Sequence, residues 1–210
     1  MAEQMAFYFD AAACTACKAC QATCKDKNSL PIGVRWRRVY RYEGGSWTPH
    51  PVDPSVKAPV GIFAYSVSIS CMHCENPLCV ENCPTGAIFK REDGVVLING
   101  EECIGCRFCE WSCPYGAPQF DDERQVMTKC DFCQDLLAKG EDPACVAACP
   151  TRALGFGPLE ELRAQFGNVD AIEPLPVADY TQPSIVITPH KNAQVSGYGT
   201  GYVANLPEEV

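Results

Sequence analysis

The sixteen cysteines of this 210-residue chain constrain its fold more than any other feature, because they occur in four groups of four. Most gaps within a group are two or three residues long, and the first and third groups follow C-x2-C-x2-C-x3-C. Such bunching predicts a chain that folds around sets of thiols. The groups are Cys14, Cys17, Cys20 and Cys24; Cys71, Cys74, Cys79 and Cys83; Cys103, Cys106, Cys109 and Cys113; and Cys130, Cys133, Cys145 and Cys149.

The C-x2-C-x2-C-x3-C run is typical of bacterial proteins that hold two [4Fe–4S] clusters. The first three thiolates of a run bind one cubane, and the fourth binds the neighbouring one, because a tight loop does not easily wrap to the opposite corner of a cube. Sixteen thiolates supply four such clusters with none left over. The spacing therefore predicts four [4Fe–4S] clusters and an electron carrier.

Exchange of the fourth ligand predicts the ligand set of each cluster. The gap of eleven residues between the second and third cysteines of group four departs from the ferredoxin spacing, so a larger loop is expected there. The predicted sets are Cys14, Cys17, Cys20 and Cys149 (cluster 1); Cys24, Cys130, Cys133 and Cys145 (cluster 2); Cys71, Cys74, Cys79 and Cys113 (cluster 3); and Cys83, Cys103, Cys106 and Cys109 (cluster 4).

Disulfides and structural zinc are the alternative uses of these cysteines. Disulfides join distant loops of small secreted domains, whereas cysteines at i, i+3 and i+6 would compete for partners. A tetrahedral zinc site takes two Cys pairs, or one pair with histidines. A third cysteine two residues after each pair is surplus for zinc, so the spacing favours iron–sulfur clusters over both alternatives.

Composition limits the class of protein further. The formal net charge of −9 argues against nucleic acid as a partner, because that binding depends on Lys and Arg. No apolar run approaches the roughly 18 residues of a spanning helix, and residues 60–69 are predicted to form a buried strand. The N-terminus has neither the basic nor the apolar region of a signal peptide. Free thiols imply assembly in the reducing cytoplasm.

An internal repeat divides the chain into modules. The phrases that begin at Cys83, Cys113 and Cys149 are variants of Cys-Pro-x-x-Ala. Residues 89–98 are predicted to form two short strands around a turn that contains Asp93-Gly94. They run directly into the third cysteine group, so groups two and three form one ferredoxin-like module.

The predicted fold class is α+β, with two ferredoxin-like [4Fe–4S] modules, one inserted in the other. Residues 68–120 form the inserted module, and residues 1–33 and 121–157 form the module of groups one and four. Residues 34–67 are a β-hairpin insertion. Residues 158–210 form a short helix and an extended tail that docks on a partner.

Two regions outside the cysteine groups carry weaker signals. Residues 34–48 are predicted to form two strands around a Gly44-Gly45 turn, and their four arginines form a basic patch, interpreted as a solvated face or as a docking site for an acidic partner. Residues 158–166 are predicted to be helical and residues 185–188 a strand. The tail from residue 173 is expected to be disordered or to lie along a partner, and its tyrosines favour the partner. The arginines of the patch are Arg35, Arg37, Arg38 and Arg41, and the tyrosines of the tail are Tyr180, Tyr198 and Tyr202.

Three single residues near the cysteines have candidate roles. His73 is interpreted as a packed core residue, with a hydrogen bond to a cluster as the alternative. Trp111 is expected to shield a cluster from water. Lys129 is either an ordinary surface lysine or a cation that raises a cluster's potential. The sequence contains no nucleophile–base constellation, no phosphate-binding loop and no mononuclear metal motif, so it predicts no substrate chemistry for this chain alone.

The chain resembles the iron–sulfur subunits of the molybdenum oxidoreductases and, among these, the B subunits of anaerobic dimethyl sulfoxide reductases. The likeness spans essentially the whole chain. It is carried by the cysteine pattern, by Tyr8-Phe9-Asp10, by the phrase from Cys103 to Pro118, by Met127-Thr128-Lys129-Cys130-Asp131, and by the closing Thr200-Gly201-Tyr202-Val203-Ala204-Asn205.

The resemblance implies a complex of three subunits. A catalytic subunit would hold molybdenum on two pterin guanine dinucleotides, and a membrane-anchor subunit would oxidise menaquinol. Electrons would enter at cluster 4, pass clusters 3 and 2, and leave at cluster 1. Some relatives lack a cysteine at the position of Cys106 and hold a three-iron cluster, whereas this chain keeps Cys106. The resemblance also implies export with the catalytic subunit to the periplasmic face of the cytoplasmic membrane.

Two alternatives to this function stay open. A stand-alone soluble polyferredoxin would have the same cysteine groups but no need of a docking tail. The same subunit could also serve a related selenate, thiosulfate or polysulfide reductase, because the flanking phrases do not specify the terminal substrate.

Overall fold

A small central sheet joins the beginning of the chain to its end. In the computed structural model, which describes residues 3–209, β1 (Met5–Asp10) pairs antiparallel with β8 (Leu154–Pro158) and parallel with β9 (Ile185–Thr188). The side chains of Phe7, Phe9 and Ile187 alternate into the core and are almost fully buried. The strand predicted at residues 185–188 is therefore confirmed, and it is the edge partner of the first strand of the chain.

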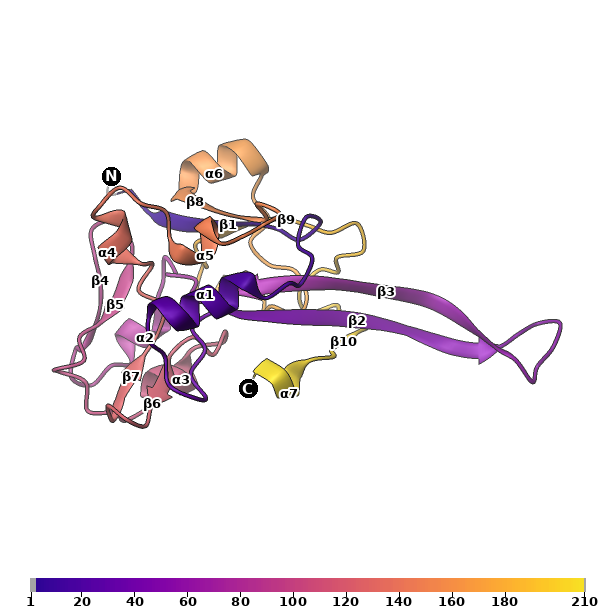
Figure 1. Ribbon diagram of the computed structural model, residues 1–210, viewed down its shortest axis with the longest axis horizontal. Coiled ribbons are helices and arrows are strands. Elements are labelled where there is room, and N and C mark those ends of the chain that lie inside the picture. Colours follow the sequence, from indigo (N-terminus) through magenta and orange to yellow (C-terminus); the bar gives the residue numbers. More distant parts are fainter. Residues whose placement is uncertain (1–2, 210) are drawn as a thin grey trace.

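A long two-stranded arm extends from this body (Figure 1). It consists of β2 (Arg38–Pro49) and β3 (Lys57–Ile69), which pair antiparallel over their full lengths. The predicted Gly44-Gly45 turn is wrong, because both glycines lie within the arm at an irregularity of the register and the true turn covers residues 50–56. A Cβ atom at Gly45, whose φ is +116°, would lie 2.8 Å from the Ile62 Cα, so the glycine allows the strands to approach.

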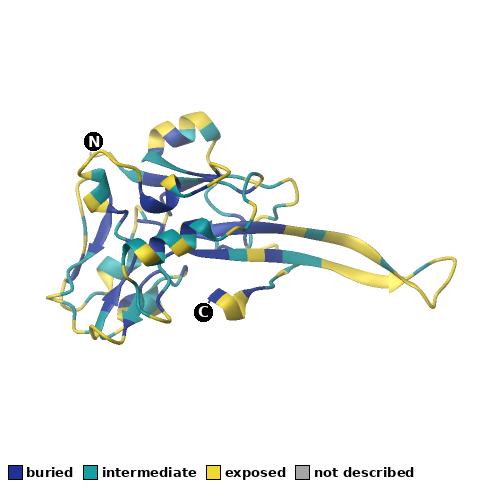
Figure 2. Ribbon diagram, in the orientation of Figure 1, coloured by how far each residue is buried: buried dark blue, intermediate teal, exposed yellow. Residues whose placement is uncertain are grey.

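Burial changes along the arm (Figure 2). At its base, Val39, Tyr42 and Val67 belong to the main core. Residues 57–62 are exposed or half-buried. The expectation of a buried strand at residues 60–69 is thus correct only for its inner half, since the outer half has no second layer to cover it.

The inserted module contains one small hairpin and two short helices, and a second small hairpin follows at its end. As predicted, β4 (Ile88–Lys90) and β5 (Val96–Ile98) pair across a turn at Asp93-Gly94, where Gly94 has a φ of +79°. The other hairpin joins β6 (Gln119–Asp121) to β7 (Val126–Thr128). The helices of this module are α2 (Leu78–Glu81) and α3 (Phe108–Ser112).

The remaining helices belong to the other module and to the tail. Helix α6 occupies most of the predicted residues 158–166, with the proline immediately before it. Small sheets and short helices together confirm the predicted α+β class. None of the helices within residues 3–209 is long and apolar enough to cross a membrane. The helices outside the inserted module are α1 (Ala19–Lys27), α4 (Gln134–Leu137), α5 (Ala144–Ala147), α6 (Leu159–Phe166), the 3-10 helix η1 (Ala178–Tyr180) and α7 (Leu206–Glu209).

The tail packs on the chain's own body. Besides β9, the short strand β10 (Tyr202–Val203) pairs with β2. The amide of Asn205 donates to the Val39 carbonyl at 2.8 Å, and α7 is held by Lys18, whose Nζ lies 2.8 Å from Glu209. The expectation that the tail would be disordered is therefore wrong for these segments, because its apolar strand completes a sheet within the same chain. Its docking on a partner stays a prediction, and its three tyrosines Tyr180, Tyr198 and Tyr202 are exposed.

Candidate iron–sulfur centres

One backbone turn recurs in all four cysteine groups. The residue immediately before the second cysteine has a positive φ in each: Ala16 (57°), His73 (42°), Gly105 (66°) and Phe132 (61°). Only one of the four is glycine, although other residues seldom adopt this conformation. A left-handed residue curls the chain back on itself, so each loop closes around a centre. Strained backbone of this kind concentrates at functional sites.

Helix pairs explain how distant groups meet. Cys20 and Cys24 lie one turn apart on α1, and Cys145 and Cys149 have the same spacing on and after α5. Helix α1 packs against α5, and α2 packs against α3 in the same way. Each packed pair thus brings the ends of two cysteine groups together, as exchange of the fourth ligand requires.

The thiols of predicted cluster 1 line a common pocket. Cys14, Cys17, Cys20 and Cys149 all contribute to its wall. Burial raises the pKa of the Cys14 thiol, and the charges of Cys20, Cys149 and Cys17 raise it further. Cys17 is exposed. This edge of the protein is therefore where a group in the pocket would lie nearest to a partner.

The thiols of predicted cluster 2 lie deeper. Burial raises the pKa of Cys24 to about 12, against the lowering effect of Arg37, while Cys145 and Cys133 act on it as negative neighbours. Burial likewise raises the pKa of Cys130, on which Cys24 and Cys145 act. The thiols of groups one and four thus act on one another, but Cys71 of the inserted module also acts on Cys130, so the ligand set of cluster 2 stays a prediction.

The inserted module repeats this arrangement. Burial raises the pKa of Cys79, and Cys71, Cys113 and Cys74 act on it as negative neighbours, which are the other three members of predicted cluster 3. In predicted cluster 4, burial raises the pKa of Cys109 to about 12, with Cys103 and Cys106 as its charged neighbours. Cys83 packs against the same apolar cluster as Cys109 and Cys103.

The donor chemistry of these sites fits cubane clusters. A cysteine gives up its thiol proton when it binds iron, so the thiolate is the form that holds a cluster. Three N–H groups already face sulfur: those of Ala117 on Cys113 (3.5 Å), Met127 on Cys103 (3.4 Å) and the Asn28 side chain on Cys24 (3.7 Å). Such bonds tune cluster potentials.

Single-ion sites do not fit. Within residues 3–209, no three His, Cys, Asp or Glu side chains converge closely enough to hold one metal ion. A structural zinc requires four donors at one point, whereas each thiolate of a cubane binds its own iron.

The basic patch expected at residues 34–48 is a solvated face only in part, because Arg41 is exposed whereas two of its arginines are buried. Arg37 and Arg38 are only 2% and 7% exposed. Arg38 donates to the carbonyls of Tyr115 (2.6 Å) and Gly116 (3.1 Å), so it ties the base of the arm to the third cysteine group. Sequence patterns missed this burial, because the partners of these arginines lie more than 30 residues away.

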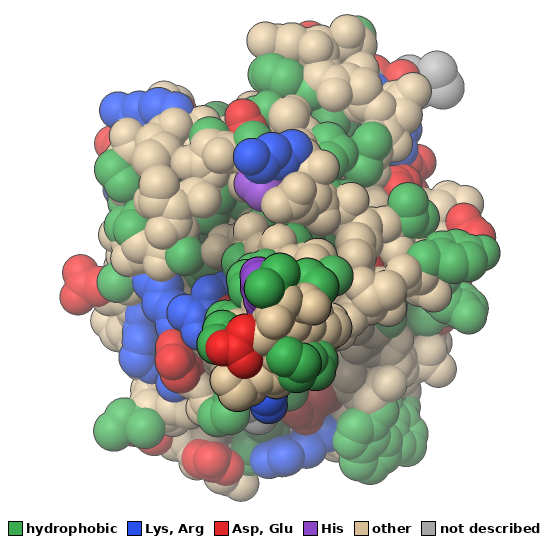
Figure 3. Space-filling model, turned by 90° about the vertical axis from the view of Figure 1, so that its right-hand side faces the viewer, with side chains coloured by type: hydrophobic (Ala, Val, Ile, Leu, Met, Phe, Trp, Pro, Cys, Tyr) green, Lys and Arg blue, Asp and Glu red, His purple; other side chains and the backbone are tan. Residues whose placement is uncertain are grey.

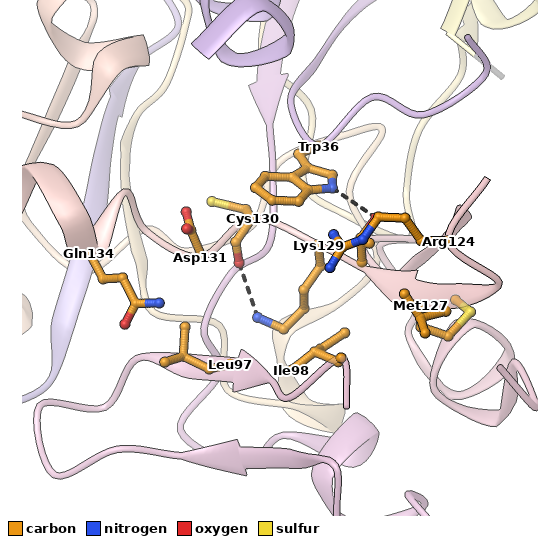
Figure 4. A pocket seen from close by; sticks show the side chains of 12 residues that line it. Trp36, Leu97, Ile98, Arg124, Met127, Lys129, Cys130, Asp131 and Gln134 are labelled. Atoms are coloured by element: carbon orange, nitrogen blue, oxygen red, sulfur yellow. Dashed lines mark hydrogen bonds between the residues drawn. The ribbon is translucent and has the colours of Figure 1, made fainter. Parts of the chain in front are cut away.

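Lys129 is also buried, contrary to the interpretation as an ordinary surface lysine, and is 4% exposed. Figure 4 shows its side chain in a pocket beside Leu97 and Ile98, where its ammonium donates to the Cys130 carbonyl at 3.1 Å. It also donates to the Val96 carbonyl. Its charge opposes the burial that raises the pKa of Cys79. The alternative role as a cation beside a cluster therefore stays a prediction, with burial in its favour.

His73 and Trp111 have opposite environments. His73 is 1% exposed and packs edge-on against Phe132, which agrees with its interpretation as a core residue. Its Nδ1 accepts the Val96 amide at 3.0 Å, and burial holds its pKa well below the ordinary value, so the ring is neutral with its proton on Nε2. Trp111 is 73% exposed, so the expectation that it shields a cluster is wrong.

Comparison with known proteins identifies the class. A family model described as a 4Fe-4S dicluster domain matches residues 62–159. The chain therefore contains an iron–sulfur domain of the dicluster class, and [4Fe–4S] clusters are its cofactors. It is 49% identical to the B subunit of the anaerobic dimethyl sulfoxide reductase of Escherichia coli K12 over 210 residues, which cover all of both sequences.

Two further relatives show the breadth of the family. The corresponding subunit of Haemophilus influenzae is 49% identical over 99% of this chain and all of the relative. The B subunit of the polysulfide reductase of Wolinella succinogenes is 36% identical over 93% of this chain and 99% of the relative. The chain belongs to the family of anaerobic dimethyl sulfoxide reductase B subunits, which confirms the resemblance inferred from its sequence.

Proposed function

We propose that this chain is the electron-transfer subunit of a sulfoxide reductase-type molybdoenzyme and carries four [4Fe–4S] clusters. The observation that carries the proposal is the repeated left-handed turn before the second cysteine of every group, together with the helix pairs that join the groups. Each bound cluster would take up and pass on single electrons. The chain has no catalytic residues of its own in this proposal.

The proposed ligands are the four sets predicted by ligand exchange, with Cys106 completing the fourth cubane. Electrons enter at the end of the molecule that carries Cys103, Cys106 and Cys109, and they leave at the edge that carries Cys17. A membrane-anchor subunit that oxidises menaquinol supplies them. A catalytic subunit with molybdenum bis(pterin guanine dinucleotide) consumes them in anaerobic respiration.

The entry end has an exposed apolar surface that supports a partner. Ile104, Phe108 and Trp111 are 66%, 48% and 73% exposed, and the rings of Phe108 and Trp111 lie 5.6 Å apart. Large exposed apolar groups gathered in one place mark interaction sites. We assign this surface to the membrane-anchor subunit, because it surrounds the cysteines of cluster 4.

The arm supports a second partner at the opposite end. Its base forms part of the wall of the Cys17 pocket through Val39 and Ser68, and the arm projects away from α3 (Figure 1). Trp47 and Ile62 are 63% and 56% exposed, and hydrophobic side chains gather at the end of the arm (Figure 3). An isolated two-stranded ribbon is marginally stable in water, so we assign the arm to the catalytic subunit.

This proposal sets the location of the protein. The clusters are loaded in the cytoplasm, and the protein is then carried with the catalytic subunit to the periplasmic face of the cytoplasmic membrane. It stays there as a peripheral subunit held by the anchor. The relatives include a polysulfide reductase subunit, so a related polysulfide, selenate or thiosulfate reductase is the second candidate complex, and a stand-alone polyferredoxin is the third.

Metal analysis tests the proposal. The protein is purified anaerobically from its native membranes in mild detergent, and molybdenum, iron and zinc are measured in the same sample. We expect molybdenum and about sixteen or more irons per chain, four for each cluster. Iron without molybdenum would favour the polyferredoxin, and zinc without iron would overturn all three candidates.

A further inference from the structure

Arg37 is a buried cation with only neutral hydrogen-bond partners. Its terminal nitrogens donate to the hydroxyls of Ser68 (3.1 Å) and Ser70 (3.0 Å), and its Nε has no hydrogen-bond partner. The Phe7 ring centroid lies 4.8 Å from the guanidinium carbon. None of the ion pairs formed within residues 3–209 includes Arg37. Neither hydroxyls nor an aromatic face supply the counter-charge that a buried guanidinium requires.

The cysteine thiolates are the negative groups that act on Arg37. Burial by itself lowers the pKa of Arg37, but the charges of Cys145, Cys20, Cys130 and Cys24 outweigh burial and raise it above its ordinary value. The interaction is mutual, because Arg37 lowers the pKa of both Cys20 and Cys24 against the raising effect of burial. A buried arginine remains charged at every pH at which the protein is folded.

The contacts of Arg37 connect two ligand sets. Ser68 lies between Arg37 and Cys20, since its hydroxyl is 3.5 Å from the Cys20 sulfur. Cys20 belongs to proposed cluster 1, whereas Cys24, Cys130 and Cys145 belong to proposed cluster 2. Arg37 therefore sits at the junction of the two clusters of groups one and four.

We propose that Arg37 is the shared counterion of clusters 1 and 2 and holds both of their reduction potentials up. This inference rests on the ligand sets of the proposed function. A ligated cluster is an anion, because its thiolates outweigh the charge of the core, and reduction adds negative charge. A fixed neighbouring cation favours the reduced form.

A redox titration of the iron-loaded protein, read by electron paramagnetic resonance, tests the role of Arg37. In the Arg37→Gln variant we expect two of the four midpoint potentials to fall. For the larger shift, the reduced-to-oxidised ratio at a fixed potential falls on the order of tenfold, which is about 59 mV for a one-electron couple. The Arg37→Lys variant keeps the charge, and its potentials stay near those of the unchanged protein.

Arg41→Gln is the matched control, because Arg41 lies four residues further along the chain, in β2, but is paired with Glu43 (3.2 Å), and its side chain is 54% exposed. The midpoint potentials of the clusters in the Arg41→Gln variant should not change. If Arg37→Gln fails to load iron while Arg37→Lys loads it, the counterion role is supported. The counterion role is overturned if Arg37→Gln and Arg37→Lys shift the potentials equally, if both variants fail equally to load iron, or if neither variant shifts the potentials.

Iron and sulfide counts on the unchanged protein distinguish a failure of the Arg37 role from a failure of the proposed function. Four clusters with unaltered potentials in Arg37→Gln would refute the role of Arg37 alone. Fewer than four clusters in the unchanged protein would refute the proposed function itself, whatever the variants do.

Discussion

Ala16 adopts a backbone conformation that costs conformational free energy, whereas the glycine at the equivalent position of group three adopts it without that cost. Both residues precede the second cysteine of their group, but Ala16 has a φ of 57° and a Cβ, whereas Gly105 has a φ of 66° and none. A non-glycine residue in this region costs roughly 1–2 kcal/mol. The equivalent residues of the other two groups, His73 and Phe132, offset their penalty by packing in the core, since they are 1% exposed.

We expect Ala16→Gly to stabilise the iron-loaded protein by up to about 1 kcal/mol, because relief of the left-handed penalty exceeds the added freedom of the unfolded chain. Slower loss of cluster absorbance on heating measures this. Thr15→Gly is the control, because Thr15 is not among the residues with positive φ, and there glycine should destabilise. Faster cluster loss in Ala16→Gly would contradict the strain at this position.

Cys106→Ser tests the entry end of the route. We expect the variant to damage cluster 4 and to block quinol-driven reduction. Activity with an artificial donor should remain, because the catalytic subunit receives those electrons directly. The two activities are measured on the same membranes. Equal loss of both would show that the route or the tolerance of the complex for a missing cluster is wrong.

Single residues also mark the limit of sequence reasoning. The ligand sets followed from spacing because cysteine has few roles in such triplets. The burial of Arg37 and Lys129 could not be predicted, because a charged side chain is buried only where long-range contacts compensate it. The exposure of Trp111 was missed for the converse reason: the sequence places it near a cluster but does not show which face of its helix meets the core.

At the scale of elements, local pattern predicted α6, β9 and the β4–β5 hairpin, because each is defined by neighbours in sequence. The arm was only half predicted. Gly44-Gly45 is a common turn signal, but here the glycines permit an irregularity inside two strands that continue to Pro49 and Lys57. The pairing of these strands past the glycines is a long-range property that turn chemistry does not report.

The arm makes a specific prediction about assembly. Replacing Trp47 and Ile62 together by serine should weaken retention of the catalytic subunit at least about tenfold, because two large apolar side chains lose their burial in the partner. Iron per chain should not change, since both residues lie outside the core. Co-purification from membranes measures the retention.

Ile32→Ser is the control for the arm, because Ile32 is fully exposed but lies outside it. This variant should retain the catalytic subunit as the unchanged protein does. If the Trp47 and Ile62 double variant also retains it, the arm is not the contact that we assign.

At the scale of the whole molecule, the tail joins the two modules. The amides of Glu75 and Asn76, in the second cysteine loop, donate to the carbonyls of Gln182 (2.8 Å) and Thr181 (3.0 Å). A few residues further on, β9 pairs with β1 of the other module. The modules are therefore held together by the tail, a contact that the sequence repeats alone do not show.

We expect a variant that ends at residue 171 to lose iron from both modules, because Phe9 and the second cysteine loop would lose their cover at the same time. A variant that ends at residue 204 lacks only α7 and the residues flanking it, and it should keep its iron. Iron per chain after anaerobic expression distinguishes the two. Full loading of the shorter variant would show that each module holds its clusters without the tail.

The parallel pairing of β1 with β9 also orders events during synthesis. The ribosome makes residues 5–10 early, but their neighbour at residues 185–188 is made roughly ten seconds or more later, at about 5–20 residues per second. Until then Phe7 and Phe9 have no completed sheet, and in the proposed ligand set Cys14 also waits for Cys149. The proposal therefore places the completion of cluster 1 late in synthesis, and for most of that time the nascent polypeptide exposes an apolar strand and reactive thiols.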